Sequence, residues 1–291
     1  DEMKEKYNKL NDENNNLKEG SKLTANASDL KTENVIDNNN ELEFIGGTNK
    51  NTITGDNGTL IISEAVGNQE GTTIDQKSVI ITSTGKLTAS ATDLAVNSAI
   101  TNGGVLIFDA TKGMTNNNEI NGDDGILVIK NDLDNNADIT ERKVIIASGT
   151  TTNEPNNTIT VKEELTVNTG AGLITSADDI VAENGLVTNN GTITFNGGTE
   201  NNNEIKGLGD LVVSNGAAIE NKANILQKTV TIEEGAGFVT DVNYLEAFKG
   251  ITNDGALTYN GEGTNKNEIT GKGTLKSLDR KSGSAGMPRP I

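Results

Sequence analysis

The chain has 291 residues, no cysteine, no histidine and a formal net charge of −18, from 42 acidic and 24 basic residues. These counts exclude disulfides, thiolate or imidazole metal sites, and Ser-His or Cys-His nucleophilic pairs. The acidic charge disfavours nucleic acid and anionic membrane surfaces as partners. No apolar run reaches the length of a transmembrane helix. We therefore expect no membrane insertion of this segment, and no Met precedes Asp1, which favours a fragment or mature form.

Residues 1–20 are highly charged and poor in strand-forming side chains. A seam at alternating steps of four and three, typical of a coiled coil, comprises Met3, Tyr7, Leu10, Asn14 and Leu17. The pattern predicts a short N-terminal α-helix. Three interpretations stay open: a coiled-coil stalk that forms a homo-oligomer through residues 3–17, a helix that caps the structure after it, or a frayed end.

Residues 21–278 contain four imperfect copies of one pattern, about 64 residues apart. The first landmark is a Leu-Thr-like segment closed by Leu or Ile seven residues later, at Leu23–Leu30, Leu87–Leu94, Leu173–Ile180 and Phe238–Leu245. The second landmark ends in an aromatic residue, at Phe44, Phe108, Phe195 and Tyr259. The third is an Asn-x-Ile-x-Gly turn that begins at Asn51, Asn118, Asn203 and Asn267. Long periods of this kind are typical of solenoids.

The apolar clusters inside a copy recur about every 20 residues, so each copy predicts three turns. The interval from Leu87 to Leu173 is longer than its neighbours by 21 to 22 residues, and Leu165-Thr-Val167 repeats the triplet that ends at Ile146. This spacing predicts one extra turn between Ile146 and Val167, an insertion that a solenoid tolerates.

The clusters are short, β-branched and often alternating, which is typical of strands, and Gly, Asn and Asp lie between them. These features predict an all-β fold, a right-handed parallel β-helix of about 12 turns. A β-sandwich is the alternative. With 33% hydrophobic residues, 3% aromatics and no Trp, the composition suits the narrow apolar column of a β-helix better than a wide core.

Residues 279–291 break the pattern and are rich in Gly, Ser and Pro, which predicts a flexible linker or tail.

Carboxylates are the remaining candidates for catalysis, because two of them suffice to hydrolyse a glycoside. The adjacent acid pairs are Asp123-Asp124, Glu163-Glu164, Asp178-Asp179 and Glu233-Glu234. Neighbouring residues on a strand point to opposite faces, and the chain has no Trp platform for a sugar. We therefore interpret these acids as solvated turn residues and expect no catalytic residue.

A calcium loop is weakly suggested by Asp132, Asp134 and Asn136, which have the spacing of the first EF-hand ligands. The pattern fails at Ala137, where that loop has Gly, and at Lys143, where it has Glu. We expect no metal site and no cofactor-binding site.

Several segments resemble the passenger repeats of bacterial autotransporters: Val187–Gly198, Ile205–Val213 and Ile251–Tyr259. The resemblance covers about residues 22–278, and the aromatic-rich strand pattern of that family's C-terminal barrel does not occur within residues 1–291. It implies an extracellular rod on the bacterial cell surface that acts as an adhesin or display scaffold, with an unknown ligand on a host or neighbouring cell. Exposed strand faces and the Asn-rich turns are candidate binding surfaces. The alternatives are a carbohydrate-active or tail-spike-type enzyme and a surface-layer or filament subunit.

Overall fold

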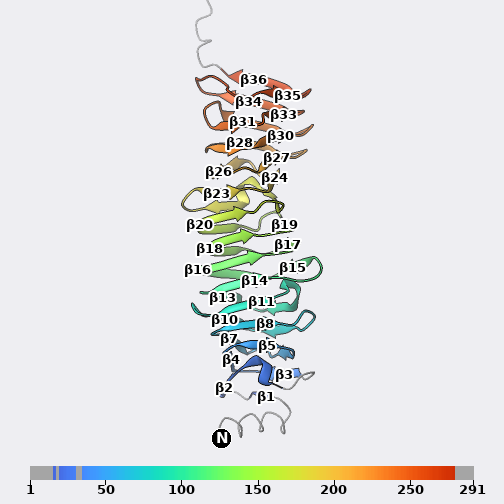
Figure 1. Ribbon diagram of the computed structural model, residues 1–291, viewed down its shortest axis with the longest axis vertical. Helices are drawn as coiled ribbons and strands as arrows, with labels where there is room; N and C mark the ends of the chain where they lie inside the picture. The colour runs from blue at the N-terminus through green and yellow to red at the C-terminus, as the bar shows by residue number, and fades with distance from the viewer. Residues whose placement is uncertain (1–15, 18–19, 31–34, 279–291) are drawn as a thin grey trace, which may run out of the picture.

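The computed structural model describes residues 16–17, 20–30 and 35–278. In these ranges the chain is a parallel β-solenoid of about 13 turns (Figure 1). The all-β solenoid prediction is therefore confirmed, with one turn more than expected. Every strand pairing given for the described residues is parallel, and each strand pairs with the strand one turn away, as in Ile100↔Ile120 and Leu106↔Leu127.

Each turn has three strand positions, which we call walls 1, 2 and 3. A representative turn contains β13 (Ala99–Asn102), β14 (Val105–Phe108) and β15 (Met114–Asn116), after which the chain returns to pair with β13. Three long strands bend around the corner from wall 1 to wall 2: β16 (Glu119–Ile129), β18 (Ile139–Ile146) and β20 (Ile159–Val167). Register shifts in β16 and β18 mark that corner.

The other strands follow the same rotation in chain order. Wall 1 also holds β2 (Lys22–Ala25), β4 (Glu41–Phe44), β7 (Thr59–Ile62), β10 (Ser78–Ile81), β22 (Ile180–Ala182), β25 (Glu200–Asn201), β28 (Ala218–Asn221), β31 (Gly237–Asp241), β34 (Ala256–Asn260) and β36 (Thr274–Leu278). Wall 2 also holds β5 (Gly47–Asn49), β8 (Ala65–Asn68), β11 (Lys86–Ala89), β23 (Leu186–Asn189), β26 (Glu204–Lys206), β29 (Ile225–Gln227) and β32 (Leu245–Ala247).

Wall 3 also holds β1 (Asn16–Leu17), β3 (Val35–Asn38), β6 (Thr52–Thr54), β9 (Ile74–Gln76), β12 (Leu94–Val96), β17 (Leu133–Asn135), β19 (Thr150–Asn153), β21 (Gly172–Ser176), β24 (Thr192–Gly197), β27 (Asp210–Val213), β30 (Thr229–Ile232), β33 (Ile251–Asn253) and β35 (Ile269–Thr270). Short 3-10 helices turn the chain at corners in the first three copies: η1 (Ala27–Asp29), η2 (Ala91–Asp93) and η3 (Ala177–Asp179).

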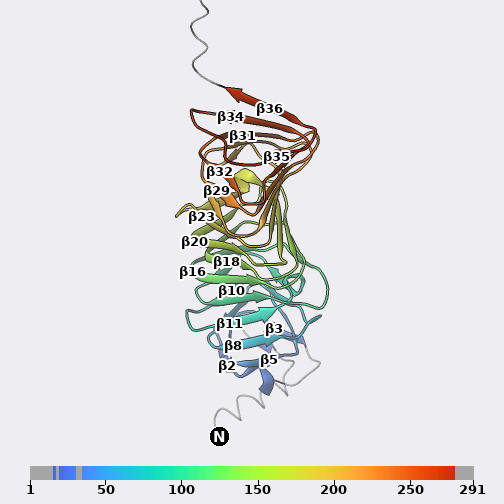
Figure 2. The ribbon, with the colours of Figure 1, turned by 45° about the horizontal axis from the view of Figure 1, so that its top comes forward.

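The sequence repeat does not return to the same wall. From β4, which carries Phe44, to β14, which carries Phe108, there are ten strand positions, or three and one-third turns. The equivalent aromatic residues therefore lie on walls 1, 2, 3 and 1 in the four copies. The expectation of three turns per copy is corrected: each copy has an additional third of a turn, which rotates it by one wall around the rod. Figure 2 shows the rod tilted so that its C-terminal end comes forward.

The extra turn lies where the sequence predicts it. Leu165 and Val167 of β20 pair with Val144 and Ile146 of β18, one turn earlier. Because the insertion spans three walls, it lengthens the rod without changing which wall comes next. Phe195 in β24 is accordingly one wall further round than Phe108, as for the other copies.

Strand alternation builds a narrow core. Leu87, Leu106, Leu127, Val144 and Leu165 form one unbroken column, and all five are fully buried. The four landmark aromatics are also buried. Columns of this kind from the three walls fill the interior mainly with aliphatic side chains, which is why the composition, with few aromatics, suits this fold.

The two ends are described only in part. Asn16–Leu17 forms β1, which pairs with Asp37 and Asn38 of β3, so the helix expected over residues 1–20 does not include this pair. Residues 1–15, 18–19 and 279–291 lie outside the described residues, and the coiled-coil and tail predictions stay predictions. No helix in the described residues is long and apolar enough to cross a membrane.

Candidate functional site

The Asn-rich turns form hydrogen-bonded rows inside the solenoid. Asn116 donates from Nδ2 to Asn118 O at 3.0 Å and to Asn135 Oδ1 at 2.7 Å. Asn135 in turn donates to Asn153 Oδ1 at 2.7 Å. Similar links join Asn49 to Asn68 and Asn201 to Asn221. Each amide therefore binds the turn above it, and water is excluded from the row.

In the second, third and fourth copies, the second asparagine of the Asn-x-Asn pair clamps the preceding turn. Asn118 accepts a hydrogen bond from Val96 N at 2.8 Å and donates to Leu94 O at 2.9 Å. Asn203 and Asn267 make the corresponding bonds to their own preceding turns. Asn118 and Asn203 are nearly inaccessible to solvent, whereas Asn117 and Asn202 in the same turns are exposed. The buried asparagines therefore cannot contact a ligand, and binding by the exposed residues of these turns stays a prediction.

A third interior contact joins residues two turns apart. Asn38 donates to Gln76 Oε1 at 2.5 Å, and Asn189 donates to Gln227 Oε1 at 2.7 Å. In the second copy Asn102 donates to Glu141 Oε1 at 2.8 Å. Glu141 is fully buried, and burial raises its pKa to about 8, against the hydrogen bond from Asn102 and the charge of Arg142.

Sequence reasoning missed Glu141, although a signal for it exists. It precedes the second β-branched triplet by three residues, as Gln76 and Gln227 precede the first and third. Aligning these three segments shows one acid where the other copies have an amide.

The predicted acid pairs do not converge. Asp123 and Asp124 are both exposed, because the register shift after Gly122 breaks the alternation expected of a strand. Glu163 pairs with Arg142 at 3.1 Å and with Lys143 at 3.3 Å. Glu233 accepts a hydrogen bond from Asn215 N at 3.1 Å.

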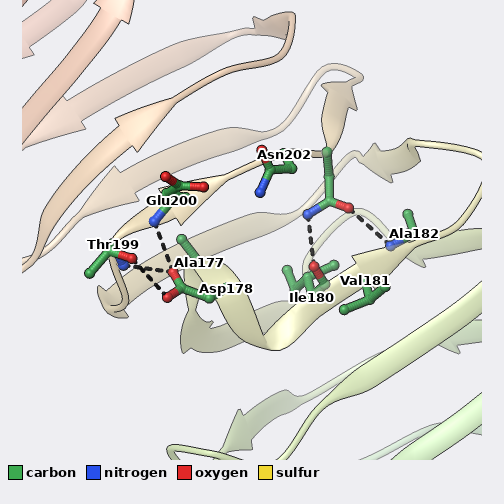
Figure 3. Close-up of a pocket in the computed structure, with 9 residues that line it drawn as sticks. Ala177, Asp178, Ile180, Val181, Ala182, Thr199, Glu200 and Asn202 are labelled. Atoms are coloured by element: carbon green, nitrogen blue, oxygen red, sulfur yellow. Dashed lines mark hydrogen bonds between the residues drawn. The ribbon is translucent and has the colours of Figure 1, made fainter.

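The pair at η3 also has separate partners. Asp179 accepts a hydrogen bond from Asn156 N. Asp178 accepts from Thr199 N, Thr199 Oγ1 and Glu200 N at 2.6, 3.1 and 2.9 Å (Figure 3). Burial would raise the pKa of Asp178, but these hydrogen bonds outweigh burial and lower it.

A shallow groove of about 260 Å³ lies beside η3 and includes Asp178, Val181 and Glu200. Asp178 points toward the Thr199–Glu200 backbone rather than into open space (Figure 3). Glu200 is engaged by Lys222, whose hydrogen bond lowers the pKa of Glu200. Neither carboxyl has the raised pKa that a general acid needs near neutral pH.

The weak calcium pattern is dispersed. Asp132 accepts a hydrogen bond from Thr150 N, and Asn136 donates to Asn117, while Asp134 lies exposed in β17. Within residues 16–17, 20–30 and 35–278, no three His, Cys, Asp or Glu side chains are grouped as metal ligands.

Exposed apolar side chains occur on the sides and at the C-terminal end of the described solenoid. Leu208 and Phe248 are 70% and 51% exposed. In the last turn Leu275 and Leu278 of β36 are 53% and 56% exposed, although Leu275 pairs with the buried Leu257 one turn before.

Comparison with known proteins gives no relative: no protein-family model, curated protein or solved structure matches this chain.

Proposed function

We propose that this chain is an extracellular bacterial surface protein whose solenoid, like an autotransporter passenger, is an adhesin or a structural display rod. One observation carries the proposal: the repeated asparagines lie inside the solenoid, where their side chains hydrogen-bond one turn to the next. An example is the row of Asn116, Asn135 and Asn153. Such residues maintain a long stack and leave the outer faces free to vary.

The rotation of the copies supports display around the rod. The corner loops of equivalent copies point in three directions, because each copy begins one wall further round. A surface that meets the rod from any side then meets some copy of the corner, so attachment would not depend on how the rod is turned about its axis.

Localisation is the first test. Antibodies raised against the folded chain are added to intact and to permeabilised producing cells, and protease is applied from outside. We expect labelling of intact cells and loss of that labelling after protease. Labelling that requires permeabilisation would contradict a surface location.

Adhesion is tested with beads that carry the native chain, a heat-unfolded chain or no protein, incubated with a panel of cell surfaces and matrix proteins. An adhesin predicts retention of the native beads above both controls. A rod that only displays other segments predicts equal retention of all three.

A glycan-cleaving enzyme is the alternative to test against. Incubation with a glycan panel followed by mass analysis should leave every glycan intact. Cleavage that disappears in D178N or E200Q would replace the proposal with an enzyme that uses the groove beside η3.

A filament subunit is favoured by one observation, the exposed Leu275 and Leu278 at the end of the stack. An exposed strand edge with apolar side chains promotes edge-to-edge association. Light scattering should then show growth with concentration that L275K reduces, while K276A, an exposed change in the same strand, does not.

A further inference from the structure

Glu141 occupies the position that glutamine holds in two other copies. The three segments are Gln76-Lys77-Ser78-Val79, Glu141-Arg142-Lys143-Val144 and Gln227-Lys228-Thr229-Val230. In each, the side-chain oxygen accepts a hydrogen bond from an asparagine two turns earlier, at 2.5, 2.8 and 2.7 Å respectively. The three copies therefore share the same hydrogen bond, but its acceptor is a carboxyl group in one copy and an amide in the other two.

The other polar atom of the side chain, Nε2 in the two glutamines and Oε2 in Glu141, distinguishes the acid from the amides. Gln76 Nε2 donates to Asp75 O at 2.8 Å, and Gln227 Nε2 donates to Leu226 O at 2.9 Å. Glu141 Oε2 takes the place of that donor, and it is buried without a hydrogen-bond partner among the described residues. An ionised oxygen only accepts hydrogen bonds, whereas a protonated one can donate.

The surroundings of Oε2 are main chain and tightly packed. A Cβ atom placed on Gly125 would lie 2.3 Å from Oε2 and 2.2 Å from Asn102 O. One placed on Gly122 would lie 2.9 Å from Oε2 and 2.1 Å from Asn102 O. The glycines therefore let three consecutive turns meet at this carboxyl, and a charge there would lack solvation.

We propose that Glu141 is an internal pH switch of the solenoid. Its neutral carboxyl replaces the glutamine amide by donating the Oε2 proton to a main-chain carbonyl. Loss of that proton to solvent leaves a buried carboxylate and loosens the turns that meet at Asn102, Gly122 and Glu141.

The nearby charges do not provide an ionic partner inside the core. Arg142, the next residue on β18, acts on the Glu141 carboxyl through its charge and lowers the pKa, but burial outweighs it and raises the pKa to about 8. The other charged side chains on β16, β17, β18 and β20 are exposed or half-buried: Glu119, Asp123, Asp124, Asp134, Lys143, Lys162, Glu163 and Glu164. β13 and β14 carry no charged side chain.

The direction of the pH effect follows from these values. The unfolded chain releases this proton near the ordinary glutamate pKa of about 4.3, whereas the folded chain keeps it to a pH of about 8. Between these values the unfolded state binds fewer protons, so stability falls as pH rises and levels off above about 8.

The direct test is a carbon-13 NMR titration of the glutamate side-chain carboxyls in the full chain, with E141Q used to assign the Glu141 signal. We expect this signal to remain that of a protonated acid at pH 6 and to titrate well above the other glutamates. A Glu141 signal that titrates near pH 4 to 5 would overturn the proposal.

The second test compares unfolding of the native chain and E141Q from pH 5 to 9. The unfolding equilibrium constant of the native chain, divided by that of E141Q, should rise by up to about tenfold per pH unit until the pH reaches the pKa of Glu141 in the folded chain. Other titrating groups are common to both proteins and cancel. A ratio that does not change with pH would refute the switch.

The chain also offers a matched variant, Q227E, which places an acid in the equivalent contact with Asn189. It should create a second carboxyl signal with a raised pKa, and amide exchange at β23, β26 and β29 should become faster than in the native chain at high pH. A Q227E carboxyl that titrates like an exposed glutamate would show that the contact does not hold an acid neutral. That outcome leaves the surface-rod proposal unaffected.

Discussion

At the scale of single residues, the buried asparagine side chains help to determine how one turn lies on the next. Asn135 is fully buried, accepts from Asn116 and donates to Ala137 O and Asn153 Oδ1. An apolar residue could fill the same space but could not satisfy main-chain carbonyls at a corner where no strand partner reaches them. The asparagine row therefore acts where the sheet hydrogen bonds stop.

Replacing Asn135 by Ala should destabilise the chain by about 2–4 kcal/mol, because Ala137 O and Asn153 Oδ1 both lose their donor inside the core. Urea unfolding followed by circular dichroism measures the change. N136A is the control, because Asn136 is exposed and donates only to Asn117 Oδ1, and it should cost less than about 0.5 kcal/mol. Equal losses would show that the row is not a stabilising feature.

At the scale of strands and corners, the glycines set how closely consecutive turns approach. Gly207 follows β26 with a φ of +140°, and a Cβ atom there would lie 2.1 Å from Asn189 O on the turn before. Gly216, in the turn after β27, has a φ of +88° but no atom within 4 Å of its Cβ position. Substitutions at these two positions therefore distinguish the cost of backbone strain from the cost of steric overlap.

We expect G216A to cost about 1 kcal/mol, from the left-handed backbone alone. G207A should cost a further 1–3 kcal/mol, because the methyl group forces two packed turns apart. Thermal or urea unfolding of the two variants provides the comparison. If G216A proved as destabilising as G207A, close approach of the turns would not be the reason for glycine at position 207.

At the scale of the whole molecule, the repeat advances by three and one-third turns, so the rod has no single repeated face. The second interval, from Leu87 to Leu173, is longer by one full turn, and the chain still reaches the next wall in order. A solenoid can change length only in whole turns, because a partial turn cannot carry the chain back to the strand on which it must pair.

Deletion of residues 147–167 should therefore yield a folded rod. Ile180 would then pair with Ile139 and Val187 with Val144, on the walls that they already occupy. X-ray scattering should show a rod shorter by about 4.8 Å with unchanged thickness. Deletion of residues 147–153 is the control: it removes the wall 3 strand β19, leaves too few residues to span that wall, and should prevent cooperative folding. A folded control would show that closure in whole turns is unnecessary.

Particular residues show how far sequence reasoning reached. The landmarks at Leu87 and Phe108 identify core positions, because alternation and burial follow from strand geometry. The extra turn before Val167 was also correctly placed, because an insertion in a stack preserves the local pattern. The acid pairs were misjudged in detail, since the bulge after Gly122 exposes both Asp123 and Asp124, and a bulge depends on the register with neighbouring turns.

By itself, the sequence determined that this chain is a parallel solenoid with a narrow aliphatic core, because periodicity along the chain is sufficient to define which residues face inward. Only the tertiary structure decided that the copies rotate by one wall, that alternate asparagines of the Asn-rich turns in the second and third copies are buried, and that Glu141 contacts Asn102 two turns away. These features depend on which turns lie against each other, and the number of residues per turn must be known before any residue can be assigned a partner above or below it.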